Sequence, residues 1–583
     1  MLKVRFLIKI TGFLLVALLF SCSENQQKKL IILETTDLHG VIFPFDFIGN
    51  EELDASLSHS ASYIKEIRAR NEALILLDNG DNLQGQPVVY YYNFIDTVSQ
   101  HFSAEAMNYL GYDAGTTGNH DIEAGHSVYD RLMKQYEFPL LAANAVDVNT
   151  GEPYFKPYTL IQKDGIKVAV IGLVTPSIPQ WLPPELYSGI EFRGMVETAK
   201  KWMPAILDEK PDLVVGLFHS GFNQEEFESR REAFLTEDGS AAVAYNVPGF
   251  DIIFNGHDHN LANEKFVTAN GDTVLMLNGG SRGRSLARAE ITFSSGNTKK
   301  ITGSIVDVRD YEPDSEFMEK FRPQKKTIHD YVDKVIGTSE ATFSSRESYF
   351  GPSAFVDMIH AVQLEITGAD ISFTAPLSFD VKIDAGPVRV GDMFKLYRYE
   401  NMLYTMNLTG QEILDYLEFS YAGWFNTMKN ANDVLLKLRM GKNGKPVLTD
   451  GKAWLANQPY NFDSAVGIDY TVDVIKRDGE KVTITGMSDG KAFDTSKMYK
   501  VAVNSYRGSG GGGHLTEGAG LSSEELRTRL ISATEKDLRY YILKSIEAKK
   551  TLHPVTYNNW RVIPEKWVRP AASREYILLF GKN

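Results

Sequence analysis

The sequence predicts an α/β protein that divides into two large domains. Its 583 residues are too many for a single hydrophobic core. Hydrophobic residues make up 43% of the chain and charged residues 23%, which are the proportions of a globular protein. Over the first half of the chain, short apolar runs alternate with amphipathic stretches, a pattern typical of a layered α/β domain.

The amino terminus, residues 1–21, is typical of a secretory signal. Three basic residues precede the apolar run Phe13–Phe20, which is shorter than the ~20 residues of a membrane-spanning helix. The residues before Cys22 resemble the lipobox of bacterial lipoproteins, although phenylalanine is bulky for its place in that motif. We therefore expect a lipid on Cys22 and a tether at residues 22–29; an unmodified cysteine after a cleaved signal is the alternative.

The first domain is expected at residues 30–312. Its predicted strands are short and rich in Val, Ile and Leu, as in sheets buried on both faces. They are Leu30–Leu33, Ala73–Leu77, Leu140–Ala143, Lys167–Val174, Leu213–Phe218, Asp251–Phe254 and Thr273–Leu277. Helical spacing predicts helices at Ser60–Arg70, Gln100–Leu110 and Val196–Asp208.

A linker helix is predicted next, within residues 313–340. The segment Pro313–Ile336 has helical spacing and many charges, and Gly337 is a suitable stop. The second domain then occupies residues 341–583. It is expected to hold helices at Ala354–Thr367 and Thr409–Phe419. Hairpin strands are expected at Ile468–Lys476 and Val482–Thr485.

Five segments of the first domain place Asp, Asn or His at the end of a predicted strand. Ligands of α/β sheets bind outside the carboxyl ends of the strands, so these side chains should meet in one crevice. Residues two apart in an extended chain point the same way, which would let a pair chelate from one strand end. The residues are Asp37 with His39, Asp81, Asn119 with His120, His219, and His257 with His259.

The ordered motifs DLHG, GD, GNHD, FHSG and GHDH resemble the calcineurin-like metallophosphoesterases, specifically the two-domain 5′-nucleotidase superfamily. The segments LLDNGDNLQGQP, YNFDSAVGIDYTVD and NSYRGSGGG are most similar to its 2′,3′-cyclic-nucleotide 2′-phosphodiesterase/3′-nucleotidase branch. The resemblance extends from about residue 30 to residue 515. It implies an N-terminal four-layer α/β-β-α sandwich and a C-terminal α+β substrate-binding domain.

The resemblance also implies two divalent metal ions. One would bind Asp37, His39, Asp81 and His259, and the other Asp81, Asn119, His219 and His257, with Asp81 bridging them. Imidazole, carboxylate and amide ligands without a thiolate suit zinc, manganese or iron. Such a pair activates a water molecule for in-line attack on phosphorus.

His120 would stabilise the developing charge and assist the leaving alcohol, as in the family. Its partner is an acid three residues on, Glu123, where related nucleotidases carry aspartate. For the nucleobase, the resemblance implies stacking on Tyr506 and on an opposing ring, which is Tyr460 or Phe462.

The glycine run 510–513 lacks the Lys-[Ser/Thr] ending of a Walker motif. The segment TAPLSFDVKI contains no arginine where related 5′-nucleotidases have one. This departure favours the cyclic-nucleotide branch and leaves phosphate recognition to the metals, with Arg398 or Arg507 as further candidates.

The expected function is hydrolysis of 2′,3′-cyclic nucleotides to 3′-nucleotides, and then to nucleoside and phosphate. A 5′-nucleotidase that also hydrolyses UDP-sugars is an alternative, and a lipoprotein that captures nucleotides without turnover is another. The net charge of −14 argues against polymeric nucleic acid as a partner. We expect a monomer in nucleotide catabolism that is anchored through Cys22 in the bacterial envelope, facing the periplasm or the outer surface.

Overall fold

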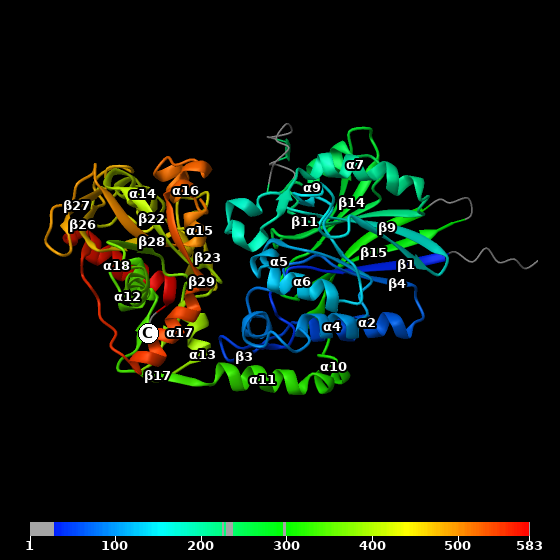
Figure 1. Cartoon of the computed structure of the whole chain (residues 1–583), viewed down its shortest axis with the longest axis horizontal. Helices are drawn as coiled ribbons and strands as arrows, with labels where there is room; N and C mark the ends of the chain where they lie inside the picture. The colour runs from blue at the N-terminus through cyan, green and yellow to red at the C-terminus, as the bar shows by residue number, and fades with distance from the viewer. Residues whose placement is uncertain (1–27, 224–226, 229–236, 295–298, 582–583) are drawn as a thin grey trace, which may run out of the picture.

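The computed structural model describes residues 28–223, 227–228, 237–294 and 299–581. The predicted signal sequence and lipobox lie outside these residues. Within them, the chain folds into two domains that face one another (Figure 1). None of the helices in the described ranges has both the length and the hydrophobicity that crossing a lipid bilayer requires.

Two six-stranded sheets form the centre of the first domain. The first has the order β16 (Lys299–Asp307), β15 (Ser285–Phe293), β1 (Lys28–Thr35), β4 (Leu74–Asp78), β5 (Ala114–Thr116), β6 (Leu140–Leu141). The second has the order β13 (Leu261–Val267), β14 (Thr273–Gly279), β12 (Ile252–Asn255), β11 (Leu213–His219), β9 (Ile166–Val174), β8 (Tyr158–Lys163). The predicted strands are confirmed, and their ends differ from the observed ends by no more than two residues. In the first sheet, β1, β4, β5 and β6 run parallel.

The two sheets pack face to face and carry helices on their outer faces. Side chains such as Ile32 and Val215 fill the space between the sheets. Helices α2 (Leu57–Ala69) and α4 (Phe102–Leu110) cover the first sheet, and α7 (Met195–Asp208) and α9 (Ser240–Asn246) cover the second. This is the four-layer α/β-β-α sandwich that the family resemblance implied.

The second domain has a large five-stranded sheet, a smaller three-stranded sheet, and a further three-stranded sheet of β21 (Gly386–Arg389), β17 (Val335–Ser339) and β30 (Thr551–Leu552). The larger has the order β25 (Ser464–Val466), β19 (Ile371–Thr374), β28 (Met498–Asn504), β22 (Met402–Thr409), β29 (Leu530–Asp537). The smaller contains the predicted hairpin β26 (Ile468–Asp473) and β27 (Val482–Met487), with β31 (Trp560–Ile563) beside β26. The main helices are α12 (Ala354–Thr367), α14 (Gly410–Trp424), α17 (Leu538–Lys549) and α18 (Glu565–Phe580).

Between the domains the chain forms α10 (Ser315–Lys320) and α11 (Arg322–Val332), and α11 runs along one side of the molecule toward the second domain (Figure 1). Phe317 and Ile328 bury these helices against the first domain. Gly337, predicted as the helix stop, lies instead in strand β17 (Val335–Ser339), because the helix ends earlier at Val332.

A buried contact joins the two domains directly. Tyr90, at the end of α3 (Pro87–Tyr90), packs in a hydrophobic cluster of the second domain that includes Phe394. Its hydroxyl donates to Oδ2 of Asp537 at 2.9 Å. A hydrogen bond to a charged acceptor in a buried place holds geometry tightly, so this contact helps to set the cleft between the domains.

Candidate metal centre and substrate cleft

The seven predicted metal ligands lie at the carboxyl ends of five strands, three in the first sheet and two in the second. Asp37 and His39 follow β1, Asp81 follows β4, and Asn119 begins helix α5 (Asn119–Glu123) after β5. His219 ends β11, and His257 and His259 follow β12. The structure brings their donor atoms together, as the rule for α/β sheets predicts.

The first group of donors consists of Asp37, His39 and His259. The Nε2 atoms of His39 and His259 lie 3.0 Å apart, and Nε2 of His259 lies 3.3 Å from Oδ1 of Asp37. Nδ1 of His39 is 3.2 Å from the carbonyl oxygen of Gln84. If Nδ1 carries the proton and donates it to that carbonyl, Nε2 is unprotonated and can bind a metal ion. This is the usual arrangement of a metal-binding histidine.

The second group consists of Asp81, His219 and His257, with Asn119 beside it. Nε2 of His219 is 3.2 Å from Oδ2 of Asp81, and Nδ1 of His257 is 2.8 Å from Oδ1 of Asn119. The remaining ring nitrogens have outer partners: Nδ1 of His219 faces the carbonyl of Asn79 at 2.6 Å, and Nε2 of His257 faces Glu237 at 2.8 Å.

Divalent cations fit these two groups. Apart from the 3.3 Å contact with Nε2 of His259, the buried Oδ1 of Asp37 has no hydrogen-bond partner among the described residues, and such an acceptor is costly unless a cation or donor satisfies it. Imidazole nitrogens that converge with carboxylate oxygens suit first-row transition metals. The backbone supports this fit, because five of the seven residues have φ between 48° and 77°, namely Asp37, His39, Asp81, His257 and His259. Such strained conformations in non-glycine residues concentrate at functional sites.

The same left-handed turns explain one difference from the sequence analysis. His257 and His259 were expected to be able to chelate together, on the assumption of extended chain. The φ values of 77° and 59° turn their side chains apart. His257 therefore lies in the second group and His259 in the first, which is the division that the family resemblance implied.

Asp121 is a positioning residue that sequence reasoning did not single out. Its carboxylate accepts hydrogen bonds from the backbone N–H groups of Asp81 and Gly118, both at 2.8 Å. It therefore clamps the loop that carries Asp81 to the turn that carries Asn119. The signal was present in the last residue of the GNHD motif.

His120 and Glu123 lie together beside the second group. Nδ1 of His120 is 2.5 Å from Oε2 of Glu123, so the longer glutamate side chain reaches the histidine across one helical turn. The backbone N–H of His120 donates to Oδ1 of Asp81 at 2.8 Å. Burial alone would lower the pKa of His120, but Asp81 and Glu123 outweigh it and raise that pKa to about 10.

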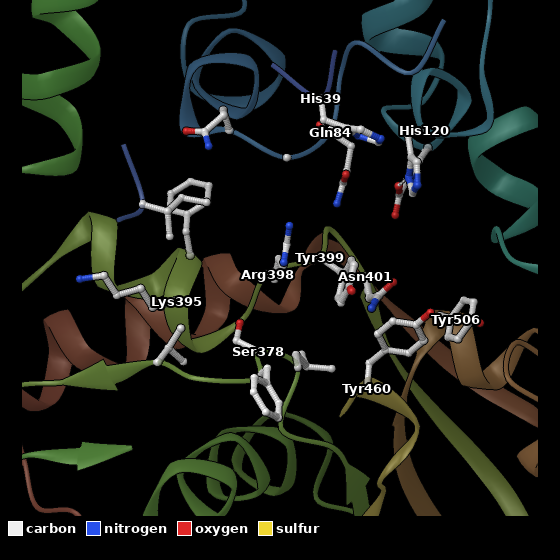
Figure 2. A pocket seen from close by; sticks show the side chains of 18 of the residues that line it. His39, Gln84, His120, Ser378, Lys395, Arg398, Tyr399, Asn401, Tyr460 and Tyr506 are labelled. Carbon is white, nitrogen blue, oxygen red and sulfur yellow. Dashed lines mark hydrogen bonds and ion pairs between the residues drawn. The ribbon is translucent and has the colours of Figure 1, made fainter. Parts of the chain in front are cut away.

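A cavity of about 900 Å³ between the domains contains His39, Asn119, His120 and His257 on its first-domain wall. Tyr460 and Tyr506 line its second-domain wall, as Figure 2 shows. Their rings are nearly perpendicular, with centroids 6.4 Å apart.

Phe462 was one of the two alternatives for the opposing ring, and the structure excludes it. It is completely buried and stacks on Trp424 at 5.0 Å in the core of the second domain. Pro459–Asn461 form a 3-10 turn (η6), not extended chain, so Tyr460 and Phe462 point in different directions, Tyr460 to the cavity and Phe462 to the core.

Arg507 is also buried, with Nε donating to Asp463 at 2.8 Å and one NH group to the carbonyl of Gly511 at 2.9 Å. It holds the glycine-rich loop and does not line the cavity. Arg398 does line it.

Tyr399 is a third tyrosine that lines the cavity, and the sequence analysis did not identify it. Its ring meets Tyr460 edge to face at 5.8 Å, and Figure 2 shows it between Arg398 and Asn401. It comes from the loop before β22, where no recognisable motif marked it.

Two family models match the chain. Residues 30–261 match the calcineurin-like phosphoesterase model, and residues 335–517 match the model of the 5′-nucleotidase C-terminal domain. Together with the four-layer fold and the two groups of donors, these matches define a metal-dependent phosphoric ester hydrolase. The chain belongs to the two-domain calcineurin-like phosphoesterases with a 5′-nucleotidase C-terminal domain, a family that implies divalent metal ions.

Relatives of known name agree with this assignment. The chain is 26% identical to the 2′,3′-cyclic-nucleotide 2′-phosphodiesterase/3′-nucleotidase of Salmonella typhimurium, over 96% of this chain and 92% of that protein. It is 28% identical over 93% of its length to the trifunctional nucleotide phosphoesterase protein YfkN of Bacillus subtilis, of which it spans only 39%. The fold is also similar to the crystal structure of a putative 5′-nucleotidase from Staphylococcus aureus, with a TM-score of 0.74 and 21% identity over 92% of this chain and 100% of that chain.

Proposed function

We propose that the protein hydrolyses 2′,3′-cyclic nucleotides to 3′-nucleotides and then releases phosphate from them. The observation that carries this proposal is one cavity that joins both groups of metal donors, His120 and three tyrosines. The similarity to enzymes of that name over 96% of the chain supports the same branch. By comparison, the similarity to a 5′-nucleotidase of Vibrio cholerae extends over only 67% of the chain, which gives less support to the rival 5′-nucleotidase function.

Asp37, His39 and His259 would hold one divalent ion, and Asp81, Asn119, His219 and His257 the other, with Asp81 shared between them. When bound, such a pair lowers the pKa of a water molecule and offsets charge on the phosphoryl oxygens. The outer partners of His39 and His219 keep both rings in the tautomer that leaves Nε2 free.

His120 would act on the leaving group. Because its Nδ1 is bonded to Glu123, Nε2 is the atom that remains for the substrate. Glu123 holds the ring in that orientation and favours its protonated form, so that Nε2–H can donate to the departing ribose oxygen. The role of His120 is thus distinct from that of the metal ligands.

The substrate preference gives the direct test of this proposal. Protein lacking residues 1–22 is expected to turn over 2′,3′-cyclic AMP and 3′-AMP with added manganese or zinc, and to lose both activities with a chelator. A higher kcat/KM for 5′-AMP and UDP-glucose would assign the protein to the rival 5′-nucleotidase function. Nucleotide binding that persists without any turnover would instead indicate a capture protein.

The tyrosines would hold the base. Replacing Tyr506 by alanine is expected to lower kcat/KM for cyclic nucleotides by an amount equivalent to ~1–3 kcal/mol, because stacking on one face of the base is lost. Bis-p-nitrophenyl phosphate, which has no base, should be affected much less. The measurement is kcat/KM on both substrates, with Tyr506→Phe as a control that keeps the ring. Equal losses on both substrates would show that Tyr506 supports the fold.

We also propose that the protein is a monomer anchored to the bacterial envelope through a lipid on Cys22. A Cys22→Ser variant is expected to keep its activity and to move from the membrane fraction to the soluble fraction on cell lysis. A variant that stays with the membrane would contradict the lipobox interpretation.

A further inference from the structure

Two arginines from different domains line the same cavity as His120 and the tyrosines. Arg282 lies in the turn between β14 and β15 of the first domain. Arg398 lies in the second domain between α13 (Val390–Leu396) and β22. Figure 2 shows the side chain of Arg398 directed toward His39 and Gln84 on the opposite wall.

Arg282 is held firmly beside the first group of metal donors. Its backbone N–H donates to the carbonyl oxygen of Asp37 at 2.8 Å. Its φ is 61°, a left-handed conformation that arginine rarely adopts. The following Gly283 has φ 64°. A Cβ atom at this residue would lie only 3.1 Å from the backbone carbonyl carbon of Ser56. A side chain cannot be accommodated there easily, so the turn keeps Arg282 in place.

Neither guanidinium has an ion-pair partner within the described ranges, although several carboxylates line the cavity. Oδ1 of Asp46 accepts from Gln86 and from the backbone of Ile48, both at 2.9 Å. Asp380 forms an ion pair with Arg346 at 2.6 Å. Asp46 and Asp380, which come from opposite domains, therefore have other hydrogen-bond or ion-pair partners, although the charge of Asp46 also attracts Arg282.

Two unpaired positive charges in a partly buried site repel each other. Burial lowers the pKa of Arg282, and the charge of Arg398 lowers it further. A bound anion would relieve this repulsion and satisfy N–H groups on both side chains. The planar guanidinium matches phosphate oxygens in a two-point geometry.

We propose that Arg282 and Arg398 form a second anion subsite, which binds a phosphate of the substrate other than the one being hydrolysed. This inference rests on the proposed nucleotide phosphoesterase function and names a substrate class for it: nucleosides that carry two separate phosphates. Because one arginine comes from each domain, the second phosphate also bridges the two walls of the cleft.

The test compares adenosine 3′,5′-bisphosphate with 3′-AMP and 5′-AMP, so that it holds whichever ester is cleaved. The wild type is expected to show a kcat/KM for the bisphosphate at least about tenfold above that for the better monophosphate, mainly through KM. Arg398→Gln and Arg282→Gln should each lower kcat/KM about 10- to 100-fold for the bisphosphate, as expected for a lost hydrogen bond to a charged group. Their losses on the monophosphates should be at least fivefold smaller.

The matched control is Lys395→Gln. Lys395 lines the same cavity, but its ammonium is paired with Asp392 at 3.0 Å. This variant should not discriminate between one phosphate and two. Thermal unfolding of all three variants checks that the fold is intact.

Equal losses on all three substrates would overturn the proposal, because the arginines would then contact the reacting phosphate or shape the cleft. Wild-type behaviour of both arginine variants would overturn it as well. If the wild type turned over none of the three substrates, the proposed function would fail. Calorimetric binding of the bisphosphate to the wild type and to Arg398→Gln would then decide the subsite separately, with tenfold weaker binding expected for the variant and equal binding contradicting it.

Discussion

Replacing Asp81 by alanine is expected to abolish turnover and to release the metal ions from both groups. The Asp81 carboxylate is fully buried and lies 3.2 Å from His219 in the second group. In the proposed arrangement it also reaches the first group, so its loss removes a ligand from each ion. Such ions would contribute several kcal/mol to the reaction, which corresponds to about three orders of magnitude or more in rate.

The measurement is the metal content of the purified variant by elemental analysis, together with kcat on 3′-AMP. Asp384→Ala is a suitable control, because it removes one exposed carboxylate that also lines the cavity. Two retained ions would contradict the assignment of Asp81 as a metal ligand. Loss of a single ion would place Asp81 in the second group alone, without a bridge.

The second large effect is expected for His120→Ala. This variant should keep both metal ions, because no donor atom of the two groups is removed. The chemical step should slow by ~10²–10⁴, the usual contribution of a positioned general acid. Single-turnover kinetics with 3′-AMP separate this step from product release.

Glu123 provides a graded companion to that experiment. Glu123→Gln keeps a hydrogen-bond acceptor for Nδ1 of His120 but removes the negative charge, so we expect a smaller loss than in His120→Ala. Glu123→Asp tests whether the shorter acid of related nucleotidases reaches the ring. Unchanged rates in His120→Ala would remove His120 from the mechanism, and unchanged rates in Glu123→Gln would show that the pair does not act as a unit.

Much of the first domain could be predicted from local sequence alone. Buried parallel strands require continuous runs of Val, Ile and Leu, and such runs are visible in sequence as short apolar segments with clear ends. The polar residues that follow them marked the site, because parallel strands present their carboxyl ends at one edge of a sheet. Asp37 and Asp81 come together in this way at one edge of the first sheet. The packing of the two sheets then brings His219, at the end of β11 in the second sheet, beside Asp81.

Other features depended on contacts between segments that are distant in the chain. The sequence left Tyr460 and Phe462 as alternatives, and only the packing of Phe462 on Trp424 separated them. Tyr399 carries no motif and is recognisable only because the loop before β22 faces the cavity.

The sequence by itself predicted the class of fold and a set of candidate metal ligands, since both depend on strand patterns and on residues at strand ends. The tertiary structure separated His257 from His259, as the family resemblance implied and the extended-chain argument did not, because left-handed turns at both residues direct their side chains apart. It also decided which charges meet across the cleft. Arg282 and Arg398 are more than a hundred residues apart, and only the docking of the two domains brings them to one cavity.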